Sequence, residues 1–245
     1  MVEVTYPPMD EPKPVAPDIW IVDSGPLRIG AMPLPVRMTV IRLPDGALVL
    51  HSPTQFSFAL KERLEALGTI SHLVAPNIAH WSFIKEWQSH FSEATTWAAP
   101  GLRKRPAVAD AGLRLDHDLG PDAPAAWQGV IETVMIEGKG LVEVEFFHRP
   151  SRTLILTDLV VNVEPDKLPL PARLAAKLVG ATAPHGRAPV YARAAVKAGG
   201  ADVATAARRL VHLAPERVIF AHGAWFESDG AARLQRSLDW LLPAS

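Results

Sequence analysis

The sequence contains no cysteine among its 245 residues. Disulfide bonds, thiolate–metal sites and cysteine nucleophiles are therefore excluded, and any metal ion must be held by His, Asp, Glu or amide groups. Net charge is small as well, because 25 basic and 26 acidic residues leave a formal charge of −1. Such a chain has no large field to concentrate nucleic acid or an anionic membrane surface, so neither is expected as a partner. We expect an unknown small molecule instead and leave the oligomeric state open.

Long apolar runs are also missing. No uninterrupted apolar stretch approaches the roughly 18 to 20 residues needed to span a bilayer. Residues 1–18 carry acidic side chains and several prolines, where a secretory signal needs a basic start and an apolar run. We therefore expect a cytoplasmic protein. The sequence has no GxSxG, no P-loop and no GxGxxG between a strand and a helix, so none of these sites is indicated.

The composition is that of a chain that folds as a globule. It is 48% hydrophobic and 21% charged, which is enough apolar material to bury a sizeable interior. A chain of this length commonly forms one α/β unit with one continuous core. We expect residues 1–18 to form an extended, proline-rich arm on the surface and residues 19–245 to form a single domain.

The apolar pattern indicates a β-rich first half and a mainly helical end. Two β-branched runs, 38–43 and 47–51, flank the turn dipeptide Asp45-Gly46 and predict a hairpin. Further strands are expected at 72–75, 95–99, 130–136, 141–148, 153–159 and 217–221. Helices are expected at 54–67, around 84–91, and at 171–179, 202–213 and 229–242, with loops filling 100–126.

Three polar residues each follow an apolar strand. His80 comes after HLVAPNIA, Asp158 after TLILT, and His222 after RVIFA. In open α/β structures ligands gather beyond the carboxyl ends of strands, so these side chains can converge although they are far apart in sequence. Imidazole and carboxylate groups suit zinc or iron, and three protein ligands with an open position are typical of a catalytic metal.

The order PNIAHW, FFHRPSRTLILTDLV and VIFAHG resembles the metallo-β-lactamase superfamily. It is more similar still to an uncharacterised branch of that superfamily known as a domain of unknown function. The resemblance covers roughly residues 19–242. It implies an α/β fold, the metallo-β-lactamase-like αββα sandwich, in which two mixed sheets face each other and helices flank them.

The resemblance also implies that most of the family's two-metal site has been lost. The family's first motif is His-x-His-x-Asp-His after a strand; if His80 takes its last position, then Ala75, Asn77 and Ala79 replace the other three ligands. Asp158 matches the family's bridging carboxylate, and His222 matches its last histidine. The remaining histidine should fall near residues 137–139, where the sequence reads Glu-Gly-Lys.

Two readings of the function follow. In the first, the chain is a metal-dependent hydrolase-like protein with at most one metal ion, acting on a small ester-type substrate. Its ligands are His80, Asp158 and His222, with Asn77, His148 or Glu143 as weaker candidates, and its catalytic residues are Asp158 and His80. The ion is zinc, manganese or iron, and a site without any ion is the alternative. In the second reading, the same fold is an inactive module that binds a ligand or a protein partner.

Each candidate also has a plainer explanation. His80 is then a partly buried imidazole bonded to a carbonyl, Asp158 a cap on a loop, and His222 part of a turn chosen for its glycine. His148 is expected at a solvent-exposed hairpin corner. The cluster 116–118, Asp-His-Asp, looks like a metal site but is interpreted as solvated, because adjacent loop residues rarely point at one ion. For His51 with Ser52, a simple turn is favoured over contact with the site.

Overall fold

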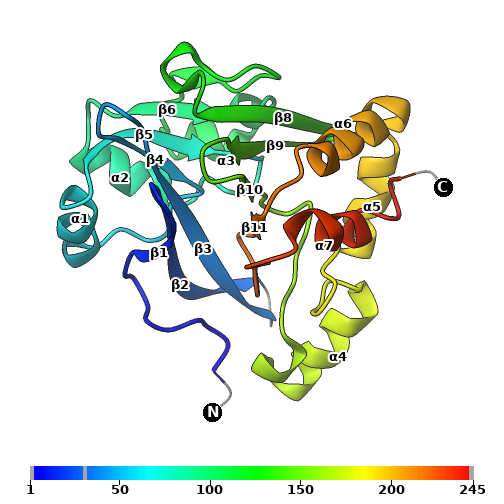
Figure 1. Ribbon diagram of the computed structural model, residues 1–245. Coiled ribbons are helices and arrows are strands. Elements are labelled where there is room, and N and C mark those ends of the chain that lie inside the picture. Colours follow the sequence, from blue (N-terminus) through cyan, green and yellow to red (C-terminus); the bar gives the residue numbers. More distant parts are fainter. Residues whose placement is uncertain (1–2, 30–31, 243–245) are drawn as a thin grey trace.

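The computed structural model describes residues 3–29 and 32–242, and shows two sheets lying face to face with helices on their outer sides (Figure 1). Both sheets are mixed, which confirms the expected sandwich. The larger sheet has its strands in chain order: β1 (Lys13–Ala16), β2 (Ile19–Ile29), β3 (Met32–Arg42), β4 (Ala47–His51), β5 (Thr69–Ala75), β6 (Thr95–Ala98) and β7 (His117–Asp118). The smaller sheet has the order β11 (Arg217–Ile219), β10 (Thr153–Ile155), β9 (Leu141–His148) and β8 (Ile131–Gly138).

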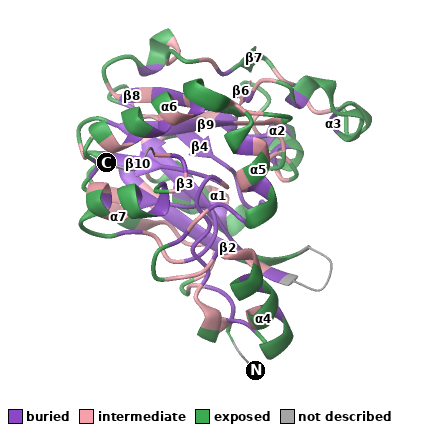
Figure 2. Cartoon of the chain, turned by 90° about the vertical axis from the view of Figure 1, so that its right-hand side faces the viewer, coloured by how far each residue is buried: buried purple, intermediate pink, exposed green. Residues whose placement is uncertain are grey.

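The helices divide between the two outer faces. The larger sheet is covered by α1 (Phe58–Glu65), α2 (Ile84–His90) and α3 (Pro106–Asp110), and the smaller sheet by α5 (Val190–Lys197), α6 (Gly200–His212) and α7 (Gly230–Ser237). The remaining helix, α4 (Leu170–Val179), lies at one end of the molecule beside β2 and is largely exposed (Figure 2). Within the described ranges, no helix is long and apolar enough to cross a membrane.

Strand alternation separates the core into layers. Leu48 and Leu50 of β4 point to the helices over the larger sheet, whereas Val49 between them faces the smaller sheet. In the same way Phe147 of β9 faces the outer helices, and Phe146 packs between the sheets with Trp127. Each sheet is therefore buried on both faces, which explains its near-continuous apolar strands.

The segment predicted as a separate arm is partly built into the larger sheet. Residues 13–16 form β1, which pairs antiparallel with β2, and Asp10 N–H donates to the Asp23 carbonyl at 2.8 Å. Val4 and Thr5 are buried. Proline restricts this segment to extended conformations, and an extended segment can add to a sheet edge as readily as it can lie on a surface.

Most predicted elements are present, with shifted ends. The hairpin around Asp45-Gly46 is confirmed, with β3 pairing antiparallel to β4. The helix predicted from residue 54 begins at Phe58 because the Ser57 hydroxyl accepts the Leu60 N–H and caps it there. The strand predicted for 153–159 ends at Ile155, since from Thr157 onward the backbone N–H groups turn away to a buried carboxylate described below. Helix α5 and the long β2–β3 hairpin were not predicted.

Candidate metal centre

Four loops that leave strand ends meet on one side of the sandwich. Ser52 follows β4, His80 follows β5, Asp158 follows β10 and His222 follows β11. Strand β4 runs parallel to β5, and β10 runs parallel to β11, so within each pair the carboxyl ends lie at the same edge. The two sheets are joined here by a backbone hydrogen bond from Val144 N–H to the Pro76 carbonyl, 2.9 Å long. Residues distant in sequence are therefore brought to one point.

The structure brings His80, Asp158 and His222 together. The Nε2 atoms of the two histidines are 3.3 Å apart. His80 Nε2 lies 3.3 Å from Asp158 Oδ2, and His222 Nε2 lies 3.3 Å from Asp158 Oδ1. One ligand atom from each residue can be chosen so that all three lie within 4.8 Å of one another.

This donor set fits a single divalent ion. An ion with nitrogen and oxygen ligands at about 2.0–2.1 Å in tetrahedral geometry has its ligand atoms about 3.3–3.4 Å apart. The two Nε2 atoms are 3.3 Å apart, and each lies 3.3 Å from a different oxygen of Asp158, His80 from Oδ2 and His222 from Oδ1. With a single Asp158 oxygen as the ligand, the three ligand atoms lie within 4.8 Å of one another. Three ligands of this kind leave a fourth position for water or substrate.

His222 is held with a nitrogen lone pair directed at the cluster. Its Nδ1 lies 2.8 Å from the Pro35 carbonyl oxygen. A carbonyl only accepts, so Nδ1 carries the proton and Nε2 of the neutral ring is free to coordinate. The ring is 4% exposed, which keeps water from competing for this contact.

His80 is held by a more adaptable partner. Its Nδ1 lies 2.6 Å from the Ser52 hydroxyl, which can either donate or accept. With Nδ1–H donating to Ser52, Nε2 is free for an ion; with Ser52 donating, Nε2–H is directed at His222 and Asp158. The sequence marked Ser52 only as part of a turn, although it follows a strand as the other site residues do.

Asn77 organises the loop instead of replacing a lost ligand. Its Nδ2 donates to Asp158 Oδ2 at 2.9 Å and to Glu143 Oε2 at 3.1 Å. Its Oδ1 accepts the N–H groups of Ala79 at 2.8 Å and His80 at 3.0 Å. One buried amide thus fixes both the backbone that carries His80 and the carboxylate of Asp158.

Glu143 likewise acts as an internal acceptor. Its carboxylate receives the N–H groups of Thr157 at 2.7 Å, Asp158 at 2.9 Å and Leu159 at 3.1 Å. With the Asn77 amide these donors use both carboxylate oxygens, and the residue is 1% exposed. Glu143 therefore orients the turn that carries Asp158, and this replaces its expected role as a weaker ligand.

The charges in the cluster shift its pKa values in opposite directions. Burial alone lowers the pKa of His80, but the charges of Asp158 and Glu143 outweigh it and leave this pKa raised. Burial alone raises the pKa of Asp158, but His80 and His222 reverse that effect and hold it well below its usual value. The cluster thus favours an ionised Asp158, which is the protonation state that metal binding requires of a carboxylate, and it also favours the protonated form of His80, whose proton an ion would displace.

The loop that carries His222 is locked against its neighbours. Arg37, a buried residue of β3, donates to the carbonyls of Phe220 at 2.9 Å and Gly223 at 2.7 Å, and its charge is paired with Asp23 at 2.6 Å. Gly223 has φ +92°, and a Cβ there would lie 2.2 Å from the Asn162 carbonyl oxygen. Only glycine satisfies both the dihedral angle and the close approach.

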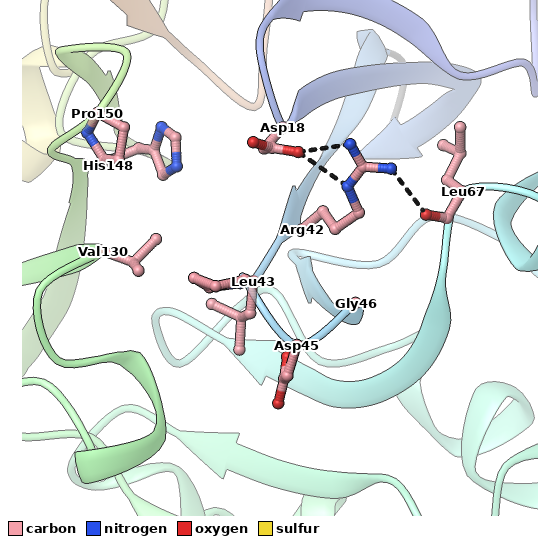
Figure 3. Close-up of a pocket in the computed structure, with 10 residues that line it drawn as sticks. Asp18, Arg42, Leu43, Asp45, Gly46, Leu67, Val130, His148 and Pro150 are labelled. Atoms are coloured by element: carbon pink, nitrogen blue, oxygen red, sulfur yellow. Dashed lines mark hydrogen bonds and ion pairs between the residues drawn. The ribbon is translucent and has the colours of Figure 1, made fainter.

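His148 is not brought to this cluster. It lies five residues beyond Glu143 on β9, about 16 Å along an extended strand. It is buried, bonds to Ser151 and lines a separate cavity of about 560 Å³ with Asp18 and Arg42 (Figure 3). The expectation of a solvent-exposed corner is therefore wrong, because His148 is 1% exposed and its Nδ1 is bonded to the Ser151 hydroxyl at 2.7 Å. The cluster at 116–118 lies at the exposed β7 edge, where Asp116 and Asp118 pair with arginines.

A cavity of about 510 Å³ opens directly onto the cluster. Ser52, His80, Asp158 and His222 form one part of its wall. The remainder comes from the β2–β3 hairpin, the loop before α2, the segment 161–168, α4 and α5. This volume lies in the range of about 300–1,000 Å³ that is usual for small-molecule sites.

Solved structures confirm the fold. A metallo-β-lactamase from Pontibacter korlensis is 15% identical with a TM-score of 0.63, covering 94% of this chain and 98% of its own. The DIM-1 metallo-β-lactamase is 14% identical with a TM-score of 0.65 over 98% of both chains. One from Hirschia baltica is 12% identical with a TM-score of 0.60, covering 96% of this chain and 99% of its own. At such identities the likeness concerns the fold alone.

No curated protein matches the sequence significantly. A family model does match residues 17–200, which is most of the chain and includes His80 and Asp158. The chain thus has the metallo-β-lactamase fold and belongs to the family described as Domain of unknown function (DUF4336).

Proposed function

We propose that this protein is a metal-dependent hydrolase-like enzyme whose reduced site holds one zinc, manganese or iron ion and acts on a small ester-type substrate. The observation that carries the proposal is the set of 3.3 Å separations among His80, Asp158 and His222, beside a cavity large enough for a substrate. His80, His222 and Asp158 would hold the ion. When bound, it would supply a Lewis acid for a carbonyl oxygen and a water whose pKa is lowered to about 7.

The other residues of the site hold the proposed ligands in position. Asn77 holds Oδ2 of Asp158, and Glu143 holds the turn on which Asp158 lies. Asp158 keeps one carboxylate oxygen that is not needed to hold the ion, and at the cavity wall this residue can exchange a proton with a substrate or with water. Loss of any of these contacts misorients the donors, and partners of this kind typically alter metal affinity by about 10–100-fold.

The test is elemental analysis of untagged protein after dialysis. We expect about one equivalent of zinc, manganese or iron, and its loss in His222→Ala. His212→Ala is the control, since this histidine is exposed on α6. Hydrolysis of p-nitrophenyl acetate should disappear with the metal and return on reconstitution. Metal content near zero, before and after incubation with each of the three ions, would overturn the proposal.

The second candidate is a binding module without catalysis, and one observation favours it. The contacts of Ser52, Asn77 and Pro35 with the cluster give each of its three side chains a hydrogen-bond partner without an ion. In that case chelator leaves the melting temperature unchanged, and His80→Ala lowers stability by roughly 1–3 kcal/mol through broken hydrogen bonds. A large fall in melting temperature on chelation would reject the module.

A further inference from the structure

The cavity beside the cluster has one polar end and an apolar body. Ser52, His80, Asp158 and His222 line the polar end. The body is formed mainly by aliphatic and aromatic side chains, among them Val36, Trp81, Val163, Ala176 and Ala192. A ligand that fills this space must present apolar groups to the body and a polar group to the cluster.

The charges of the lining restrict the ligand further. Among the described residues that line the cavity, none is Lys or Arg, and Asp158 is the single carboxylate. An anionic group in the body of the cavity would be removed from water without a cation or a row of donors to compensate it. The lining therefore selects against carboxylate, phosphate and sulfate groups.

The opening of the cavity is also apolar. Leu27 and Tyr191 both line the cavity and are 38% and 74% exposed. They come from the β2–β3 hairpin and from α5. Tyr191 carries an uncharged phenol at neutral pH, and burial together with the charge of Asp158 raises its pKa further.

From these three observations we infer that the cavity takes an uncharged, hydrophobic acyl or aryl group, and that the substrate is a neutral ester or lactone whose carbonyl lies at His80, Asp158 and His222. The assignment of the carbonyl rests on the proposed function; the assignment of the cavity does not. Each methylene buried in the cavity contributes about 0.8 kcal/mol, which corresponds to about three- to fourfold in binding.

The reaction is hydrolysis and needs water as its single co-reactant. The water oxygen forms a bond to the carbonyl carbon, and the bond from that carbon to the alcohol oxygen breaks. The alcohol leaves with one proton of the water, and the acid holds the other until it ionises.

Binding is tested first, with a matched pair of fluorescent probes. N-phenyl-1-naphthylamine is neutral, and 8-anilinonaphthalene-1-sulfonate is the same aromatic skeleton with a sulfonate. We expect the neutral probe to bind at least tenfold more tightly, in the metal-loaded protein and after chelation alike. Equal affinity, or preference for the sulfonate, would overturn the inference.

Two filling variants show where the probe binds. Ala176→Phe on α4 and Ala192→Phe on α5 replace buried methyl groups of the lining, and each should weaken the neutral probe at least tenfold. Ala175→Phe and Ala194→Phe add the same ring to exposed positions of the same helices and should leave binding within twofold. Because the two filling variants lie on different helices, either one that folds is decisive. Unchanged binding in a folded filling variant would refute the cavity as the site.

Hydrolysis separates the two proposals. With p-nitrophenyl acetate, butyrate and octanoate, kcat/KM should rise about three- to fourfold per methylene in the native protein and stay flat in Ala176→Phe. A folded, metal-loaded protein that binds the neutral probe but hydrolyses no ester refutes the proposed function and leaves the cavity assignment standing. Hydrolysis without any dependence on chain length refutes the assignment of the cavity and leaves the hydrolase standing.

Discussion

Glu143 offers a sharp test of how the Asp158 turn is held. Its carboxylate accepts the N–H groups of residues 157–159 at 2.7 to 3.1 Å and the Asn77 amide at 3.1 Å, in a position 1% exposed. Glu143→Gln keeps the shape but replaces one oxygen with an NH₂ group. That group can accept nothing and would face N–H donors.

The cost can be worked out from these contacts. A hydrogen bond to a charged group contributes about 1.5–3 kcal/mol, and a buried donor left without an acceptor costs about 1–3 kcal/mol. Glutamine retains one acceptor oxygen, so the loss corresponds to one or two such bonds. We therefore expect the free energy of unfolding to fall by about 1.5–6 kcal/mol. We also expect affinity for the metal ion to fall by about 10–100-fold, because Asp158 loses its orientation.

The assay is urea unfolding followed by tryptophan fluorescence, with metal affinity measured on the folded protein. Glu137→Gln is the control, because Glu137 is exposed on the neighbouring strand β8 of the same hairpin. It should change stability by no more than about 0.5 kcal/mol. If Glu143→Gln unfolds at the same urea concentration as the native protein, the turn does not depend on this carboxylate and the reasoning is refuted.

Two further predictions concern His51 and Gly223. Burial, followed by the charge of His80, lowers the pKa of His51 from 6.5 to about 3; the unfolded chain therefore takes up a proton below pH 6.5 that the folded chain refuses. Between pH 7.5 and 5 this proton uptake should lower the free energy of unfolding by about 2 kcal/mol. His51→Gln should therefore flatten the pH dependence of unfolding by that amount, and an unchanged slope would contradict the role of His51. Gly223→Ala should cost more than about 3 kcal/mol, because a Cβ meets the Asn162 backbone at 2.2 Å. Gly101→Ala, with a φ of +90° but open space, should cost only about 1–2 kcal/mol; equal losses in chemical unfolding would show that the close contact is unimportant.

Local pattern was sufficient for much of the fold. The Asp45-Gly46 turn, the apolar run at 47–51 and the helix expected at 54–67 all depend on neighbours in sequence, and the structure shows these elements near the predicted positions. Their ends were less accurate. A helix start depends on one cap, Ser57, and the end of β10 depends on Glu143, which lies on another strand.

Alternation was misleading where burial depends on a distant segment. Glu143 and Glu145 alternate with valines in a pattern typical of a half-exposed strand, yet they are 1% and 0% exposed. Burial, and then the charge of Glu143, raises the pKa of Glu145 well above its usual value, which favours the neutral form of this carboxyl group in the core. His148 was expected at an exposed corner and is buried for the same reason, because other parts of the chain cover β9.

The sequence by itself determined which residues can coordinate: with no cysteine, the donors had to be imidazole and carboxylate groups, and His80, Asp158 and His222 each follow a strand. Only the tertiary structure decided that the two sheets bring these strand ends to one point, with atoms 3.3 Å apart. It also decided the roles of Asn77, Glu143 and the Pro35 carbonyl, and the apolar cavity beside them. The physical reason is that strand and helix patterns record short-range spacing, whereas a site depends on contacts between segments that the chain brings together from far apart.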